Sequence, residues 1–228
     1  MLADFDGTIC LHDVGVCLLN RFGEPDWTAI SQAYQRGDRT YRELLTEENA
    51  MLEGTREEML AFVLDHCPMD PTFASFAGWL RGLGIPLTVV SDGSAFHIEP
   101  MLAAIGLLDV PIITNRLVFG PDERFSGLAF PNAHPECIGC GTCKMLAVTN
   151  AQTAVGPVAF IGDGVSDRFA VLYADVVFAK RELPALCQEA GVPYRAWTDF
   201  DDVRLSLESG ELMPQAKAPI LCPGWTLP

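Results

Sequence analysis

The chain has 228 residues, of which 49% are hydrophobic and 20% charged, a composition typical of one globular domain with at most a modest insert. Its 15 basic and 30 acidic residues give a formal net charge of −15, which disfavours nucleic acid and anionic membranes as partners because both are polyanions. No apolar run approaches the roughly 18 residues of a membrane span, and the N-terminus lacks a basic-then-apolar leader pattern. We therefore expect a cytoplasmic protein whose eight cysteines are mostly reduced.

Five short apolar segments alternate with helix-like segments along the chain. The apolar segments are residues 2–5, 86–91, 111–114, 158–162 and 175–179. They are continuously apolar, as expected for strands of a parallel sheet that is covered on both faces. Helices are expected between them at residues 71–83, 95–105, 142–152, 167–174 and 183–189. This alternation predicts an α/β fold with a doubly wound, mostly parallel, Rossmann-like sheet.

Residues 14–70 interrupt this alternation with helix-like segments only. These segments lie near residues 14–21, 26–36, 41–51 and 56–66. Thr55 followed by Glu58 predicts a capping box at the start of the last of them. We expect a small helical subdomain at 14–70, inserted into a core domain made of residues 1–13 and 71–228. The alternative is that these helices simply flank the sheet.

The two ends of the chain are less regular. The first strand has only Met1 to Ala3 before its acidic end, whereas a strand usually has about five residues, so we hypothesise that the native chain starts further upstream. Residues 210–228 contain four prolines and no periodicity, which predicts an extended or mobile surface segment.

Polar residues gather where candidate strands end and where one candidate helix begins. The segments are 4–8 (DFDGT), 91–93 (SDG) and 162–167 (GDGVSD), and Lys144 lies near the start of the helix expected at 142–152. The carboxyl ends of parallel strands meet at one edge of the sheet, where open α/β folds bind ligands. We therefore expect these side chains to form one site.

The acidic residues of this edge predict a metal site. Clustered carboxylates repel one another unless a cation lies between them. Mg²⁺ prefers oxygen ligands in a near-octahedral shell, so we expect a magnesium site formed by Asp4, Asp6 and Asp163. Asp167 either completes this site, directly or through water, or holds Lys144 in place. A bound metal also explains how a phosphate dianion enters so acidic a site.

The remaining polar residues fit the binding of a phosphate group. Thr8, Ser91 and Gly93 offer hydroxyl or N–H donors to phosphate oxygens, and Lys144 adds a positive charge. Lys180 is the rival for this lysine role. It follows the strand after the last acidic motif, whereas Lys144 precedes that motif at a helix start, so Lys144 is favoured.

Two of the carboxylates are suited to the chemistry of phosphate ester hydrolysis. Asp4 serves as a nucleophile towards phosphorus, which splits a slow reaction into two easier steps. Asp6, two residues on, protonates the leaving oxygen and later activates water.

The motifs resemble those of the haloacid dehalogenase superfamily of phosphotransferases. This resemblance implies that Asp4 is the nucleophile, Asp6 the acid/base, Ser91 the phosphate-binding hydroxyl and Lys144 the motif lysine, with Asp163 and Asp167 in the acidic metal motif. The helical insert resembles the small cap of the phosphoserine phosphatase branch, subfamily IB. The superfamily uses Mg²⁺ as its cofactor, which the resemblance implies here too.

Five segments resemble more narrowly the methionine-salvage branch, which contains 2-hydroxy-3-keto-5-methylthiopentenyl-1-phosphate phosphatase. They are residues 89–96 (VVSDGSAF), 114–119 (TNRLVF), 140–144 (CGTCK), 160–170 (FIGDGVSDRFA) and 174–180 (ADVVFAK), and the similarity runs from Asp4 to about Val203. The resemblance implies a phosphatase that acts on a small phosphorylated metabolite through an aspartyl-phosphate intermediate. Ser91 is followed by Asp-Gly rather than by the two glycines more usual in the phosphoserine branch, which counts against serine phosphate.

His134, Cys137, Cys140 and Cys143 form an H-x₂-C-x₂-C-x₂-C pattern. Zinc is bound by such side chains, so they form a possible zinc site, although structural zinc sites usually combine two separated ligand pairs. An iron–sulfur cluster is less favoured because no fourth cysteine stands nearby in the sequence. The alternative is a loop of reduced cysteines beside the active site, in which Cys140 and Cys143 pair under oxidation.

Other functions fit parts of the pattern. Among enzymes, the alternatives are a phosphoserine phosphatase or another small-molecule phosphotransferase, such as a sugar mutase. A phosphoacceptor signalling domain also clusters aspartates, a hydroxyl and a lysine on an α/β sheet, but it has no helical insert. A metal- or redox-responsive binding protein built on the cysteine loop would have a degenerate acidic site, and the intact motifs argue against that. The sequence leaves the choice between monomer and homodimer open.

Overall fold

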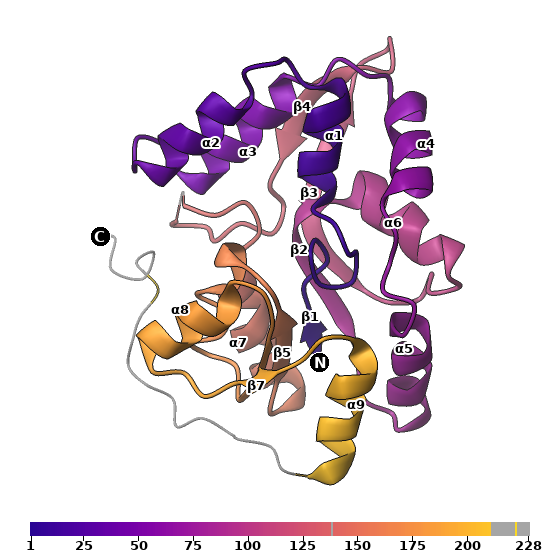
Figure 1. Ribbon diagram of the computed structural model, residues 1–228, viewed down its shortest axis with the longest axis vertical. Coiled ribbons are helices and arrows are strands. Elements are labelled where there is room, and N and C mark those ends of the chain that lie inside the picture. The colour runs from indigo at the N-terminus through magenta and orange to yellow at the C-terminus, as the bar shows by residue number, and fades with distance from the viewer. Residues whose placement is uncertain (138, 211–221, 223–228) are drawn as a thin grey trace.

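The computed structural model describes residues 1–137, 139–210 and 222, and it is built around one seven-stranded sheet (Figure 1). The strands are β1 (Leu2–Ala3), β2 (Thr88–Ser94), β3 (Ile112–Phe119), β4 (Phe125–Ala129), β5 (Ala159–Gly162), β6 (Val176–Ala179) and β7 (Arg195–Ala196). Their order is β4-β3-β2-β1-β5-β6-β7, and all neighbouring pairs are parallel except β3 and β4. The predicted doubly wound, mostly parallel α/β fold is confirmed.

Helices cover both faces of this sheet. They are α5 (Phe73–Gly82), α6 (Ala95–Ala104) and α9 (Phe200–Ser209) on one face, and α7 (Lys144–Val155) and α8 (Leu183–Ala190) on the other. Phe76 and Phe200 pack in the first core, and Val148 and Cys187 pack in the second. Because β5 and β6 lie between the two cores and are buried along their whole length, their sequences are continuously apolar. None of the helices in the described part of the chain has the length and apolar character needed to cross a membrane.

Four further helices come from residues 14–66 and lie at one end of the sheet, at the top of Figure 1. They are α1 (Val14–Phe22), α2 (Thr28–Gln35), α3 (Tyr41–Ala50) and α4 (Arg56–His66). The predicted capping box of Thr55 and Glu58 is present at the start of α4. The helices rest on the β3–β4 hairpin: the Arg56 N–H donates to the Glu123 carbonyl over 2.7 Å, and α3 packs against β4.

Several elements differ from the sequence expectations. The helix predicted at 167–174 is wrong: Val165–Asp167 form a short 3₁₀ helix, and turns follow. The Asp167 side chain turns inward and accepts hydrogen bonds from the N–H groups of Asp163 and Gly164, which ends the regular structure there. The strands β4 and β7 and the helix α9 were not anticipated. The expectation for residues 210–228 lies outside the described residues, apart from Gly210 and Cys222.

The central strand β1 marks the point where the strand order reverses. It pairs with β2 on one side and with β5 on the other, and the N–H of Asp4 continues the pairing by donating to the Ile161 carbonyl over 2.9 Å. Such a switch point opens a crevice at the carboxyl ends of the strands. The acidic motifs after β1 and β5 and the polar residues at the end of β2 therefore meet at one place.

Candidate active site

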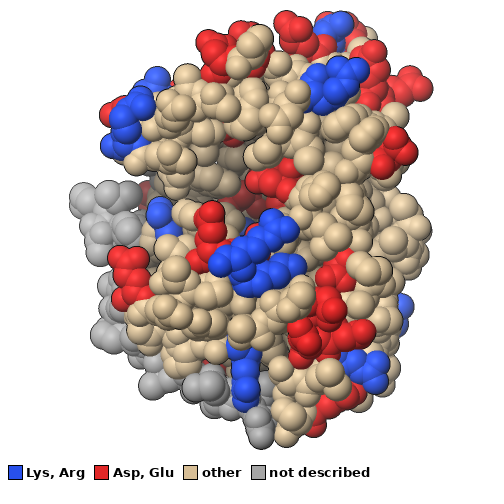
Figure 2. Space-filling model, viewed as in Figure 1, with Lys and Arg blue, Asp and Glu red and all other residues tan. Residues whose placement is uncertain are grey.

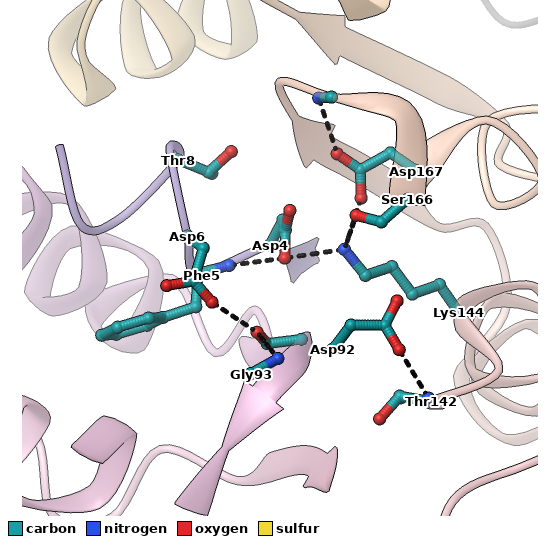
Figure 3. Close-up of polar contacts among 12 residues, drawn as sticks. Asp4, Phe5, Asp6, Thr8, Asp92, Gly93, Thr142, Lys144, Ser166 and Asp167 are labelled. Carbon is teal, nitrogen blue, oxygen red and sulfur yellow. Dashed lines mark hydrogen bonds and ion pairs between the residues drawn. The ribbon is translucent and has the colours of Figure 1, made fainter. Parts of the chain in front are cut away.

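A buried ion-pair network joins the end of β1 to the start of α7 (Figure 3). Lys144 Nζ lies 2.7 Å from Asp4 Oδ1 and 2.8 Å from Asp167 Oδ1, and it donates to Ser166 Oγ over 2.8 Å. The Phe5 N–H also donates to Asp4 Oδ1, over 2.7 Å. Burial lowers the pKa of Lys144, but the charges of Asp167 and Asp4 outweigh burial and raise its pKa above the usual range. Lys144 is therefore a fixed positive charge beside Asp4.

Asp4, Asp163 and Asp167 place one carboxylate oxygen each within 4.8 Å of one another, and all three side chains are buried. Burial, followed by the charge of Asp167, raises the pKa of Asp4 well above its usual range and the pKa of Asp163 to about 6. One lysine does not neutralise three carboxylates. This set of hard oxygen donors therefore fits a divalent cation such as Mg²⁺.

The loop after β1 holds Asp163 in place. Thr8 is fully buried; its hydroxyl donates to Asp163 Oδ1 over 3.0 Å, and its N–H donates to the Phe5 carbonyl. Thr8 therefore supports a carboxylate of the acidic group, and its contact with phosphate stays a prediction. Gly7 has a φ of 74°, and a Cβ at this position would lie 2.1 Å from Asp163 Oδ2, so the loop requires glycine here.

Asp6 lies beside the three clustered carboxylates rather than among them. Its Oδ1 accepts from the Val14 N–H over 2.9 Å, and its Oδ2 accepts from the Ser91 hydroxyl over 3.2 Å. Its role as a metal ligand therefore stays a prediction. Burial, followed by the charge of Asp13, raises the pKa of Asp6 to about 7. A carboxyl group with such a pKa is suited to give and take protons near neutral pH.

The end of β2 brings the two other phosphate-binding candidates to the same place. Ser91 Oγ accepts from the Gly93 N–H over 2.9 Å. A Cβ at Gly93 would lie 2.7 Å from Asp6 Oδ2 and 3.1 Å from Ser91 Oγ, so a larger residue would push into the site. Both residues line the same cavity as Asp4 and Asp6.

Asp92 has a role that the sequence pattern did not reveal. Its Oδ1 accepts from the Thr142 N–H over 2.6 Å, and Asn115 donates to its carbonyl oxygen over 2.7 Å. These bonds anchor the turn that immediately precedes Lys144. The side chain that caps α6 belongs to Ser94. The partners of Asp92 are distant in sequence, so only the fold identifies it as a positioning residue.

The rival lysine lies outside the ion-pair network. Lys180 Nζ donates to the Thr8 carbonyl over 3.2 Å and lies 3.8 Å from the centre of the Trp197 ring. Lys180 thus contacts the backbone of the loop after β1, whereas Lys144 contacts the carboxylate of Asp4 directly.

A cavity of about 880 Å³ extends from the acidic residues towards α1, α2 and α3. Figure 2 shows this hollow with acidic side chains on its floor and basic side chains at its lower edge. Its lining includes the apolar residues Leu18, Leu19 and Leu45 and the basic residues Arg36, Arg39, Arg168 and Arg181. The cavity therefore offers cations, apolar surface and the acidic group to one small ligand.

His97 also lines this cavity, although no sequence pattern singled it out. Its side chain is buried, and neither ring nitrogen has a hydrogen-bond partner among the described residues. Burial lowers the pKa of His97 to about 3, so the ring is neutral at neutral pH.

The four residues proposed from the sequence as zinc ligands lie together near the start of α7, around a cavity separate from the large one. His134, Cys137, Cys140 and Cys143 line a small cavity of about 10 Å³. Cys222, from the far end of the chain, lines the same cavity, together with Met145. The zinc site itself stays a prediction.

Known proteins resemble this chain in sequence and in fold. The family model of the haloacid dehalogenase-like hydrolases matches residues 1–170. A 2-hydroxy-3-keto-5-methylthiopentenyl-1-phosphate phosphatase of Brevibacillus brevis is 32% identical over 206 residues, which cover 89% of this chain and 92% of the relative. A phosphatase of the same name from Bacillus velezensis is 26% identical over 212 residues, or 92% of this chain and 89% of the relative.

The solved structures agree at the level of the fold. A substrate-bound phosphoserine phosphatase complex matches with a TM-score of 0.69 at 17% identity, over 91% of this chain and 96% of that one. A phospho-aspartyl intermediate analogue of phosphoserine phosphatase matches with a TM-score of 0.67 at 16% identity, over the same shares of the two chains. The chain belongs to the haloacid dehalogenase-like hydrolases and is a phosphatase of that superfamily.

Proposed function

We propose that this phosphatase hydrolyses a small phosphorylated metabolite with Mg²⁺ as cofactor and with Asp4 as the nucleophile. The geometry of the Asp4 carboxylate carries this proposal. Both Lys144 and the Phe5 N–H contact Oδ1, at 2.7 Å each, and no described residue donates a hydrogen bond to Oδ2. The two contacts on Oδ1 fix the orientation of the whole carboxylate. Because the side chain lines the large cavity, Oδ2 is available to attack a phosphorus atom.

Asp4, Asp163 and Asp167 would hold the metal ion, with Asp6 as a further candidate ligand. When bound, the ion supplies charge that offsets the carboxylates and the phosphate oxygens. Lys144 opposes the rise in the pKa of Asp4 that burial causes, and it adds a second positive charge. Ser91 and Gly93, near the end of the neighbouring parallel strand β2, would provide donors for the phosphate oxygens.

The reaction then follows from the placement of Asp4 and Asp6. Asp4 attacks phosphorus, the ester P–O bond breaks, and the leaving oxygen takes a proton from Asp6. In the second step Asp6 takes a proton from a water molecule that attacks the aspartyl phosphate. The bond between phosphorus and Asp4 breaks, inorganic phosphate leaves, and both carboxyl groups return to their starting states.

The helical insert has a part in this proposal. Residues 14–70 form a cap over the core domain of residues 1–13 and 71–228, and they bring apolar and basic residues to the cavity opposite the acidic group. Such a cap excludes bulk water and selects the substrate. Placement in the cytoplasm fits the eight cysteines, all of which are thiols.

The substrate we favour is a phosphate ester with an apolar tail, and the methionine-salvage phosphates named for the relatives are of this kind. Leu18, Leu19 and Leu45 would contact the tail. Phosphoserine is the second candidate because of the fold likeness. It carries an ammonium and a carboxylate group that would have to be desolvated against this leucine surface.

Phosphate release from a panel of metabolites tests the proposal. The panel holds 2-hydroxy-3-keto-5-methylthiopentenyl-1-phosphate, phosphoserine, sugar phosphates and pyridoxal phosphate, each with Mg²⁺, with EDTA and with Asp4→Asn. We expect Mg²⁺-dependent release that the Asp4→Asn variant loses while its circular dichroism spectrum is unchanged. Retained turnover in pure Asp4→Asn protein would refute the role of Asp4, and preferred turnover of phosphoserine would refute the apolar substrate.

A further inference from the structure

Four cysteines lie together next to the active site and take no part in phosphoryl transfer. Cys137, Cys140 and Cys143 come from the loop before α7, and Cys222 comes from the far end of the chain. We propose that these four cysteines bind one structural Zn²⁺ ion that fixes the loop carrying Lys144. The proposal is independent of the substrate and of the phosphatase mechanism.

The ligand set is the first argument. Structural zinc sites are tetrahedral, and sets of four thiolates are common among them. The loop alone supplies three sulfurs with the spacing C-x₂-C-x₂-C. Such sites usually join ligands from separate parts of a chain, and the fold adds the missing distant ligand in Cys222.

The cavity between these residues is the second argument. Its volume of about 10 Å³ is close to that of one water-sized sphere, which suits a single ion better than a multinuclear iron–sulfur cluster. Cys143, Met145 and Cys222 are buried, and Leu146, Phe169 and Tyr173 pack against them. This apolar wall shields Cys143 and Cys222 from solvent, whereas Cys137 and Cys140 are partly exposed.

Backbone donors point at two of the sulfurs. The Gly139 N–H donates to Cys137 Sγ over 3.3 Å, and the Leu146 N–H donates to Cys143 Sγ over 3.4 Å. N–H groups directed at sulfur stabilise the thiolate form that a metal requires. Cys143 is also the N-terminal cap of α7, where the helix dipole favours negative charge.

The sulfurs surround the cavity at a wider spacing than a closed zinc site requires. Among the described residues, only Asp4, Asp163 and Asp167 bring three ligand atoms within 4.8 Å of one another. In a tetrahedral site with zinc–sulfur bonds of about 2.3 Å, the sulfurs lie just under 4 Å apart. Binding would therefore draw the sulfurs closer together and fix the loop in that position.

The loop connects this site to both halves of the active site. Arg42, on α3 of the insert, donates to the Cys137 carbonyl over 2.8 Å and to the Cys140 carbonyl over 3.0 and 3.1 Å. Lys144 follows Cys143 directly in the chain. An ion that fixes the loop thus fixes both the contact with α3 and the start of the helix that bears the catalytic lysine.

Elemental analysis of the full chain tests the proposal. The protein is purified without a histidine tag and without chelator, and zinc, iron and copper are measured against protein concentration. We expect about one zinc ion per chain in the wild type. Cys140→Ser and Cys222→Ser should lose the zinc. Cys187→Ala is the matched control, because Cys187 is a buried thiol in the core under α8 and should leave the zinc content unchanged.

A second measurement uses only wild-type protein, in case the serine variants do not fold. Titration with an organomercurial in the presence of a chromogenic zinc chelator should release zinc in step with the modification of four thiols. Substitution by Co²⁺ should give the intense sulfur-to-metal charge-transfer bands of a four-thiolate site.

Three outcomes would overturn the proposal. One is less than about a tenth of an equivalent of zinc in the wild type. Another is a Cys140–Cys143 disulfide in the protein as it is purified, before any metal is removed. The third is a Cys222→Ser variant that keeps zinc while His134→Ala loses it, because His134 would then be the fourth ligand in place of Cys222.

Discussion

Lys144 Nζ lies 2.7 Å from Asp4 Oδ1, in an ion pair that is buried between the end of β1 and the start of α7. Two segments that are far apart in the sequence therefore meet through one charged contact. The same lysine also holds Asp167, so it balances part of the negative charge that the acidic group concentrates. In the proposed mechanism this contact sets the reactivity of Asp4, and we expect it to stabilise the fold around the site.

Replacing Lys144 with methionine should cost both activity and stability. The variant leaves Asp4 and Asp167 buried without their cation, which costs about 3–5 kcal/mol in the free energy of unfolding. Urea unfolding at pH 7 measures this loss, and phosphate release measures the activity. Lys180→Met is the matched control, since Lys180 Nζ contacts a carbonyl oxygen and an aromatic ring rather than a carboxylate. Equal stability of Lys144→Met and wild type would contradict the role of this ion pair.

Replacing Gly7 with alanine should weaken metal binding. The new Cβ would lie 2.1 Å from Asp163 Oδ2 at a φ of 74°, so the carboxylate must move. Disturbing the residues that hold a metal ligand in place typically lowers metal affinity by about 10–100-fold. The Mg²⁺ concentration at half-maximal activity reports this shift. Gly78→Ala, at an exposed position inside α5 with open space around it, should leave that concentration unchanged. The same Mg²⁺ dependence in Gly7→Ala and wild type would contradict the account.

His97 predicts a definite pH dependence of stability. Its pKa is lowered to about 3 in the folded protein by burial, whereas an unfolded histidine has a pKa of about 6.5. Below pH 6.5 the unfolded state therefore binds a proton that the folded state does not, and the free energy of unfolding falls as the pH falls towards 3. His97→Phe removes this contribution, which is about 2 kcal/mol between pH 7 and pH 5.

Urea unfolding of the wild type and of His97→Phe at both pH values measures the difference. Comparing the two proteins cancels the contributions of the acidic residues, whose raised pKa values act in the opposite direction. Parallel pH dependences of the two proteins would mean that His97 takes up a proton in the folded state.

The sequence predicted the centre of the molecule better than its periphery. The strands β1, β2, β5 and β6 were found because strands buried on both faces are continuously apolar. The motifs at their ends followed from the rule that strands of a parallel sheet present their carboxyl ends together. β4 was missed because the segment from Phe125 to Ala129 is a half-exposed partner of β3 and contains Ser126 and Gly127.

Contacts between residues that are distant in the sequence could not be predicted either. Asp92 holds Thr142, and Cys222 joins the cysteine loop, yet no local pattern connects either pair. The error at residues 167–174 has a similar cause. Asp167 turns its side chain towards Lys144 and towards the N–H groups of its own loop instead of starting a helix. Local propensity does not register such tertiary contacts.

Chemical trapping of the phosphorylated enzyme tests the central claim most directly. Wild-type protein is mixed with its best substrate and Mg²⁺, quenched, reduced with borohydride and analysed by tandem mass spectrometry of the N-terminal peptide. Borohydride converts an aspartyl phosphate to homoserine. We expect homoserine at Asp4, dependent on substrate and Mg²⁺, and unchanged aspartate at Asp6. Steady phosphate release with Asp4 unmodified, or homoserine at Asp6 or Asp163 instead, would contradict the account.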